Sequence, residues 1–279
     1  MRKHGFTLIE LIIVLLVLAS LAALVVPTLG FVKDQSDTAL AANGAQQVLN
    51  NLETYKAATG RYPDRLDTLV DETGAAYSPV YTINGPGNPY IGRVASAATG
   101  NFFYYYMQNG GGISQVSVHD STNVPGASGY DPNAPGAAQD LGGGTNLVIA
   151  EAGESYTGKR GSIISTCFPN QDPADTSAGR ATIPEGHTLV FMGVGANNGA
   201  VGATMTQAPL APEKSAYDPE QYDRFIAVFD VTSGGSNFRG QVKLKALLDP
   251  QFNVVSRNLT AYKSSTPDDS FGQSAPATP

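Results

Sequence analysis

The sequence predicts an α+β protein in which one long N-terminal helix packs on an antiparallel β-sheet with long loops. Residues 6–59 form a continuous helical pattern that is apolar in its first half and amphipathic in its second. Later segments alternate strand-like runs with polar loops. The chain also has 31 glycines and 18 prolines but only 15% charged residues, a balance that favours short strands and surface loops over a helical bundle.

The first element is an apolar helix over residues 6–32, in which Glu10 is the only charged residue before Lys33. About 20 apolar residues cross the hydrocarbon layer of a membrane, so this segment is expected to span one. The basic residues Arg2 and Lys3 precede it and are expected to hold that end in the cytoplasm, with the bulk of the chain on the other side. Pro27 removes a helical hydrogen bond and predicts a kink or a local loosening.

Glu10 needs an explanation, because a carboxylate in a bilayer costs about 2.5–3.5 kcal/mol and normally has a partner or a function. Cleavage between Gly5 and Phe6 would create an ammonium group four residues before Glu10. The two charges could then pair, within one chain or between neighbouring chains with a fixed axial stagger. A plain uncleaved anchor fits the length of the segment but gives Glu10 no role.

The stretch "GFTLIELIIVLLVLASLAALVVP", preceded by a short basic leader, resembles the class III signal of type IV pilin-like proteins. The resemblance implies a pilin-like fold and removal of residues 1–5, the leader, by prepilin peptidase. It also implies that Phe6 becomes the N-methylated first residue and that Glu10 is the assembly carboxylate. The precursor would be a single-pass inner-membrane protein that polymerises with itself through its N-terminal helices.

The second half of the helix, residues 33–59, is predicted to be an amphipathic stem that docks on the globular domain. Leu40, Val48, Leu52 and Tyr55 recur at spacings of three and four, which places them on one helical face. Gly60 is placed to end the helix.

Two further stretches narrow the resemblance. "ATGRYPDRLDTLV" (residues 58–70) and "GPGNPYIG" (residues 85–92) are similar to segments of the major pseudopilin of type II secretion. In that family they follow the stem as a Tyr-Pro turn, a short helical piece and a Gly-Asn-Pro-Tyr turn, and the same is expected here.

Residues 60–263 are predicted to form a globular β-rich domain, and the Ser- and Pro-rich residues 264–279 a disordered tail. Strand-like runs include residues 101–107, 187–195, 224–231 and 241–248. The aromatic run "NFFYYYM" (residues 101–107) is expected to be a core strand, the alternative being an exposed stacking surface for glycans or a filament neighbour.

No residue pattern indicates catalysis, so the protein is not expected to be an enzyme. Cys167 is the only cysteine and is expected to be a small core residue. His119 and His187 are expected to lie at the surface or to cap loops, and one cysteine with two scattered histidines does not indicate a zinc site. The net charge of −7 weighs against nucleic acid as a partner.

No cofactor is expected, and calcium is the one metal for which the sequence has candidates. Major pseudopilins hold calcium in a C-terminal loop, and "FMGVGANNGAVG" stands where the resemblance implies that this loop begins. Asn197 and Asn198 occupy the positions of the aspartates, which weakens a site for a hard cation. Asp218, Glu220, Asp223 or Asp230 could compensate.

The leading hypothesis is a structural subunit of a pilin-like helical filament in type II secretion, a periplasmic pseudopilus. One alternative is a type IV pilus subunit for adhesion, motility or DNA uptake, in an extracellular pilus. The alternative from another class is a membrane-anchored enzyme or binding protein that uses residues 6–32 as a plain anchor. Both filament hypotheses imply prepilin peptidase and the secretion or pilus assembly machinery as partners.

Overall fold

The computed structural model describes residues 8–74, 93–96, 102–123, 127–131, 133–152, 155–156, 158–168, 181–211, 222–233, 240–250 and 252–257. For some of these, Glu10 and Pro27 among them, only the backbone is described. The predicted leader, the Gly-Asn-Pro-Tyr turn and the predicted disordered tail lie outside the described residues.

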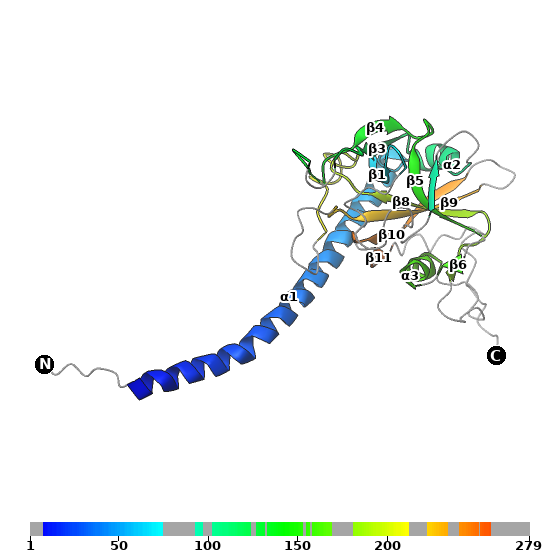
Figure 1. Ribbon diagram of the computed structural model, residues 1–279. Helices are drawn as coiled ribbons and strands as arrows, with labels where there is room; N and C mark the ends of the chain where they lie inside the picture. Colours follow the sequence, from blue (N-terminus) through cyan, green and yellow to red (C-terminus); the bar gives the residue numbers. More distant parts are fainter. Residues whose placement is uncertain are drawn as a thin grey trace, which may run out of the picture.

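The N-terminal helix α1 runs from Leu8 to Thr59 and projects from the rest of the molecule (Figure 1). Its 52 residues correspond to a length of about 78 Å at 1.5 Å per residue. The helix continues through Pro27, and Figure 1 shows a gradual bend along its length. It ends as predicted at Gly60, whose φ of 76° leaves the helical region. Among the described residues, no helix combines the length and apolar character needed to cross a membrane.

A nine-stranded sheet forms the centre of the globular domain. Its main path runs in the order β11-β10-β9-β8-β1-β3-β4, and β5 pairs with β8 and with β2. The strands are β1 (Leu66–Asp71), β2 (Arg93–Ser96), β3 (Gln115–His119), β4 (Ala137–Asp140), β5 (Asn146–Glu151), β8 (His187–Gly193), β9 (Ile226–Thr232), β10 (Gln241–Leu248) and β11 (Val254–Arg257). A separate small sheet joins β6 (Ser155–Tyr156) to β7 (Ala181–Thr182). The sheet is mostly antiparallel, as predicted, but β1 and β3 are parallel.

Helices cover both faces of the large sheet. The C-terminal part of α1 and helix α2 (Phe102–Gly111) share one core with residues such as Phe229 and Leu244. Helix α3 (Gly158–Cys167) packs on the opposite face against residues such as Phe191 and Val228. The domain therefore has three layers around two hydrophobic cores, where the sequence predicted helical cover from the stem alone. Cys167 is 1% exposed within the second core, as expected of a small core residue.

Three local predictions were wrong. The aromatic run at residues 101–107 belongs to helix α2, because Phe103, Met107 and Gly111 recur every four residues and bury one face against the sheet. The segment after Tyr62 is the fully buried strand β1 and not a helical piece. Leu40, assigned to the docking face of the stem, is 57% exposed.

Candidate functional site

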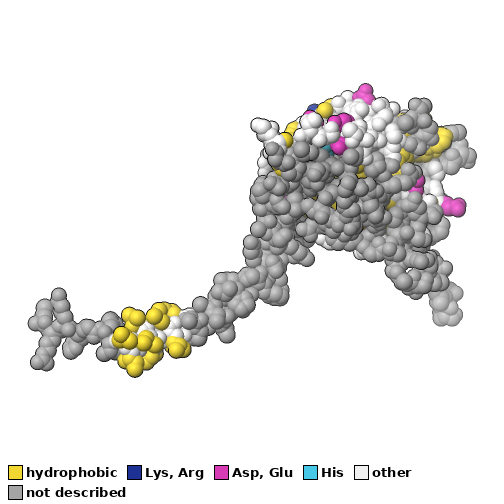
Figure 2. Space-filling view, in the orientation of Figure 1, with side chains coloured by type: hydrophobic (Ala, Val, Ile, Leu, Met, Phe, Trp, Pro, Cys, Tyr) yellow, Lys and Arg dark blue, Asp and Glu magenta, His cyan; other side chains and the backbone are white. Residues whose placement is uncertain are grey.

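The described end of α1 is an apolar helix without cover. All ten described side chains between Leu8 and Leu18 are Leu, Ile or Val, and their exposed fractions lie between 49% and 78%. Figure 2 shows them gathered at the end of the helix that is far from the globular domain. A helix that is apolar on all sides has no face suited to water, so it requires lipid or other helices around it.

The predicted processing and assembly residues lie at this end. Gly5 and Phe6 lie outside the described residues. Glu10 is the third residue of α1, between the exposed Ile9 and Leu11, and its side chain is not described. Its pairing with an amine therefore stays a prediction.

The C-terminal part of α1 docks on the sheet as the sequence predicted. Ala45, Val48, Leu49 and Leu52 are at most 4% exposed and follow the predicted three- and four-residue spacing. Hydrogen bonds from loop side chains reinforce this packing. Thr204 Oγ1, for example, donates to the carbonyl oxygen of Asn51 at 2.9 Å.

Tyr62 joins the end of α1 to the sheet. Its hydroxyl accepts hydrogen bonds from the Leu244 backbone amide at 2.8 Å and from Lys56 Nζ at 3.0 Å, and it donates to Glu53 Oε1 at 3.0 Å. Its ring packs edge-on against Phe229, with 5.0 Å between ring centroids. Burial, followed by the Glu53 carboxylate, raises the pKa of Tyr62 well above 10.0. The sequence identified Tyr62 only as part of a turn.

The loop that resembles a calcium loop is closed by an asparagine side chain. Asn198 is 2% exposed, its Nδ2 donates to the carbonyl oxygen of Gly195 at 2.6 Å, and its Oδ1 accepts from the amide of Ala200 at 3.0 Å. The amide of Gly199 donates to the carbonyl oxygen of Asp64 at 2.8 Å, which ties the loop to the turn before β1. The loop is thus held by neutral hydrogen bonds at the place where a hard cation would need carboxylates.

The calcium candidates have separate surroundings. Asn197 is exposed, and Asp218 lies outside the described residues. Asp223 is buried next to Arg224, and its backbone amide donates to Asn133 Oδ1. Asp230 is engaged by two basic groups, Lys245 Nζ at 3.4 Å and His187 Nδ1 at 2.9 Å. Within the described part of the chain, no three His, Cys, Asp or Glu side chains are grouped to hold a metal ion.

A buried polar cluster that the sequence did not indicate lies between β1, β3 and the segment before β9. The Tyr222 hydroxyl donates to Asp67 Oδ2 at 2.9 Å, and His119 Nε2 lies 4.0 Å from the same oxygen. Burial raises the pKa of Asp67 to about 7, while burial and the charge of Arg224 lower the pKa of His119 to about 4. Both groups are therefore largely uncharged between pH 4 and 7.

The same cluster explains two glycines of the loop sequence "GVGANNG". A Cβ atom on Gly193 would collide with the Tyr222 hydroxyl, and one on Gly195 would collide with both carboxyl oxygens of Asp67. His119 and His187 were expected to lie at the surface or to cap loops, but their side chains are only 2% and 12% exposed. Each is instead held beside a buried aspartate.

Comparison with known proteins agrees with the architecture of the N-terminal third. The prokaryotic N-terminal methylation motif matches residues 1–26. The type II secretion system core protein G of Aeromonas hydrophila is 40% identical over 81 residues, which are 28% of this chain and 57% of that protein. The protein of the same name from Dickeya chrysanthemi is 33% identical over 93 residues, 33% of this chain and 61% of the relative. That of Escherichia coli (strain K12) is 31% identical over 100 residues, 36% of this chain and 69% of the relative.

The chain spans about three fifths of the length of the first two relatives. No solved structure is significantly similar to it. The long helix with its exposed apolar end and the methylation motif define a pilin-like subunit. More specifically, the chain belongs to the family of the type II secretion system core protein G. The methylation motif and the similarity to core protein G are those of a pseudopilin-like subunit.

Proposed function

We propose that the chain is the repeating subunit of a helical filament of type II secretion, assembled through the N-terminal part of α1. The observation that carries the proposal is the ring of exposed apolar side chains between Leu8 and Leu18. Packing many such helices side by side would bury this surface, and burial of apolar area is favourable at about 25 cal/mol per Å². The globular domains would then form the outside of the filament.

Before assembly the same segment would be held in lipid. Residues 6–32 would cross the inner membrane, with the globular domain in the periplasm. Prepilin peptidase would cut between Gly5 and Phe6, and the new amine would be methylated, as the match to the methylation motif over residues 1–26 supports. A methylated amine still takes up a proton, so it keeps the charge that Glu10 needs.

In the filament, Glu10 would pair with the Phe6 amine of a neighbouring subunit. Each charge is costly alone in an apolar surrounding, and pairing removes both costs at one axial offset. The pair would therefore select the stagger between subunits, while the apolar side chains supply the attraction.

Mass spectrometry of the chain from its host tests the processing step. The expected mature protein starts at a methylated Phe6, and Gly5→Val should leave the leader attached. A chain that still starts at Met1 would contradict the proposal. It would support the alternative in which residues 6–32 are only an anchor for a binding protein.

Glu10→Gln tests assembly, because it keeps the size of the side chain and removes its charge. We expect the variant to be cleaved as efficiently as the wild type and to form no filaments by electron microscopy. Glu185→Gln, on an exposed turn of the domain, is the matched control and should assemble normally. Normal filaments from Glu10→Gln would refute the pairing.

The pseudopilus and surface-pilus hypotheses differ in whether the filament lies in the periplasm or outside the cell. Similarity to core protein G supports a periplasmic pseudopilus. The alignments, however, cover 28–36% of the chain, so most of the globular domain lies beyond them. Immunogold labelling of intact and permeabilised cells decides between the two. Labelling only after permeabilisation is expected, and long labelled filaments on intact cells would favour a surface pilus.

A further inference from the structure

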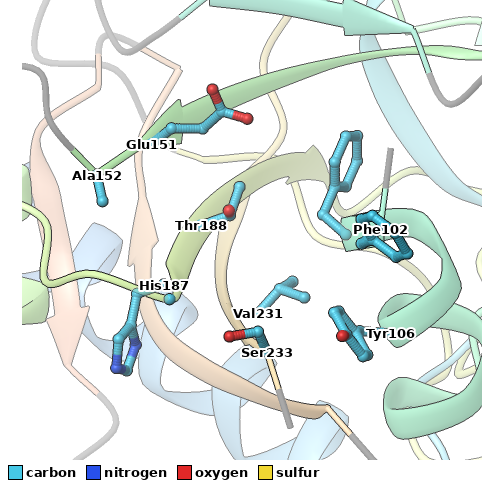
Figure 3. Close-up of a pocket in the computed structure, with 10 residues that line it drawn as sticks. Phe102, Tyr106, Glu151, Ala152, His187, Thr188, Val231 and Ser233 are labelled. Atoms are coloured by element: carbon cyan, nitrogen blue, oxygen red, sulfur yellow. The ribbon is translucent and has the colours of Figure 1, made fainter. Parts of the chain in front are cut away.

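A pocket opens on the α1 side of the sheet, next to the N-terminal end of α2. Its volume is about 290 Å³, near the lower limit for small-molecule sites. Helix α2 contributes one wall with Phe102 and Tyr106, while Thr188 and Val231 come from the neighbouring strands β8 and β9 (Figure 3). Glu151, at the end of β5, lies across from the aromatic wall.

The aromatic wall combines the exposed ring of Phe102 with the half-buried ring of Tyr106. Phe102 is 71% exposed, and it precedes Tyr106 by one helical turn, so both rings lie on the same side of α2. An exposed ring beside a pocket can contact a ligand without first being uncovered. The arrangement offers a flat apolar face at the mouth of the pocket.

The pocket is also held in shape before any ligand binds. The ring of Tyr106 packs directly on Gly240, where no Cβ could be accommodated, and edge-on against Tyr105. The Ser233 amide donates to the carbonyl oxygen of Gly186 at 2.9 Å, and both residues line the pocket. A preformed site loses less entropy on binding than one that must be ordered.

The chemistry of the walls restricts the ligand. No lysine or arginine is among the described lining residues, so none of them offers a phosphorylated or acidic ligand a cationic side chain of these two types. A wholly apolar ligand would remove water from Glu151, Thr188 and Ser233 without replacing its hydrogen bonds. The remaining neutral class has an apolar face for the rings and hydroxyl groups for the polar wall.

We propose that this pocket binds a neutral sugar ring, stacked on Phe102 and Tyr106 and hydrogen-bonded through its hydroxyl groups to Glu151. A pyranose carries C–H groups on one face and hydroxyl donors around its edge, which matches the two walls. The carboxylate of Glu151 accepts hydrogen bonds from hydroxyl donors, and such charge-assisted bonds are stronger than neutral ones. The hydroxyl groups of Thr188 and Ser233 can both donate and accept.

Saturation-transfer NMR tests the site on the full chain, in a detergent whose headgroup contains no sugar. The probes are methyl β-glucopyranoside, methyl β-galactopyranoside and N-acetylglucosamine, with N-acetylarginine amide as the cationic comparison. At least one sugar should receive saturation from the protein, with its strongest transfer on the C–H face. Phe102→Ala and Glu151→Gln should each weaken its binding about tenfold or more.

Matched controls separate the pocket from general effects. Glu185→Gln removes an exposed charge two residues before the lining residue His187. It should bind sugar like the wild type, and Phe102→Tyr should keep binding because it keeps the ring. Circular dichroism confirms that each variant is folded. The proposal is overturned if no sugar binds, if Phe102→Ala and Glu151→Gln bind as well as the wild type, or if the arginine probe binds more tightly than every sugar.

Discussion

Replacing Asp67 by Asn should change how the stability of the domain depends on pH. The folded protein buries Asp67 completely, which raises its pKa from 3.8 to about 7. In the folded state this group keeps its proton up to about pH 7, whereas the unfolded chain loses it near pH 3.8. Its contribution to stability is therefore complete below pH 3.8 and is lost as pH rises towards 7.

The magnitude follows from the same two values. At about 1.4 kcal/mol per pH unit, the difference between 3.8 and about 7 corresponds to about 4 kcal/mol of unfolding free energy. His119, next to Asp67, acts in the opposite direction. Its pKa is lowered from 6.5 to about 4, so its contribution is complete above pH 6.5 and is lost as pH falls to 4, by about 3 kcal/mol.

The two residues together predict an almost flat profile for the wild type between pH 4 and 6.5. In this range the unfolded chain holds a proton on His119 and the folded protein holds one on Asp67, so folding changes the proton count little. Tyr222, Arg65 and Arg224 are the other ionisable groups that act on Asp67, and all three lower its pKa less than burial raises it.

The amide side chain in the Asp67→Asn variant keeps an acceptor for the Tyr222 hydroxyl but cannot ionise. The variant should gain about 3 kcal/mol in stability from pH 4 to 6.5, because over this range the unfolded chain holds a proton on His119 that the folded protein does not. Relative to the wild type, it should gain about 4 kcal/mol between about pH 4 and 8. Urea unfolding of the full chain, followed by circular dichroism at several pH values, measures both slopes. The control variant Asp140→Asn, at an exposed position on β4, should show a stability profile parallel to that of the wild type. A constant difference in stability between Asp67→Asn and the wild type across this pH range would refute the reasoning.

Three further variants test the contacts that hold the domain to the stem and close the loop. Tyr62→Phe removes the acceptor of the buried Leu244 amide and should lower the unfolding free energy in urea by about 2 kcal/mol, so an unchanged midpoint would show that the hydroxyl is dispensable. Gly195→Ala places a Cβ on the Asp67 carboxyl group and should lower the unfolding free energy by about 1–3 kcal/mol. Gly44→Ala, in ordinary contact with Phe225, should be neutral or stabilising. Equal melting temperatures of the two variants would contradict this. Asn198→Ala removes two hydrogen bonds and should lower the unfolding free energy by about 1–3 kcal/mol. EDTA should leave the melting temperature of the wild type unchanged, and a large drop would indicate a metal in this loop.

The sequence predicted the elements whose signal is local. The stem was predictable because Val48, Leu49 and Leu52 repeat at helical spacing, and Gly60 ends the helix where expected. Helix α2 was missed because its aromatic residues favour strands. The helix has only ten residues, so its four-residue spacing repeats too few times to be recognised. The parallel pairing of β1 with β3 depends on where β3 lies in space, which no local pattern encodes.

The buried polar groups could not have been predicted from any local pattern. Asp67 and Tyr222 are 155 residues apart, so nothing in either neighbourhood indicates that they share a hydrogen bond. Two glycines of "GVGANNG", Gly193 and Gly195, were a visible signal, and the space taken by Asp67 and Tyr222 explains them. The sugar pocket likewise combines residues from α2, β5, β8 and β9.

The two ends of α1 differ in what they need from outside the chain. Around Tyr62, the last turns of the helix are bonded to the sheet through Glu53, Lys56 and Leu244, so every polar partner comes from the same chain. Between Leu8 and Leu18, no described side chain is covered by the domain. A subunit whose helix is fixed at one end and uncovered at the other transmits any displacement of the helix to the domain, because moving the helix alone would break the Tyr62 hydrogen bonds. The rigid attachment and the uncovered end are therefore complementary requirements for a subunit that moves or stacks as one body.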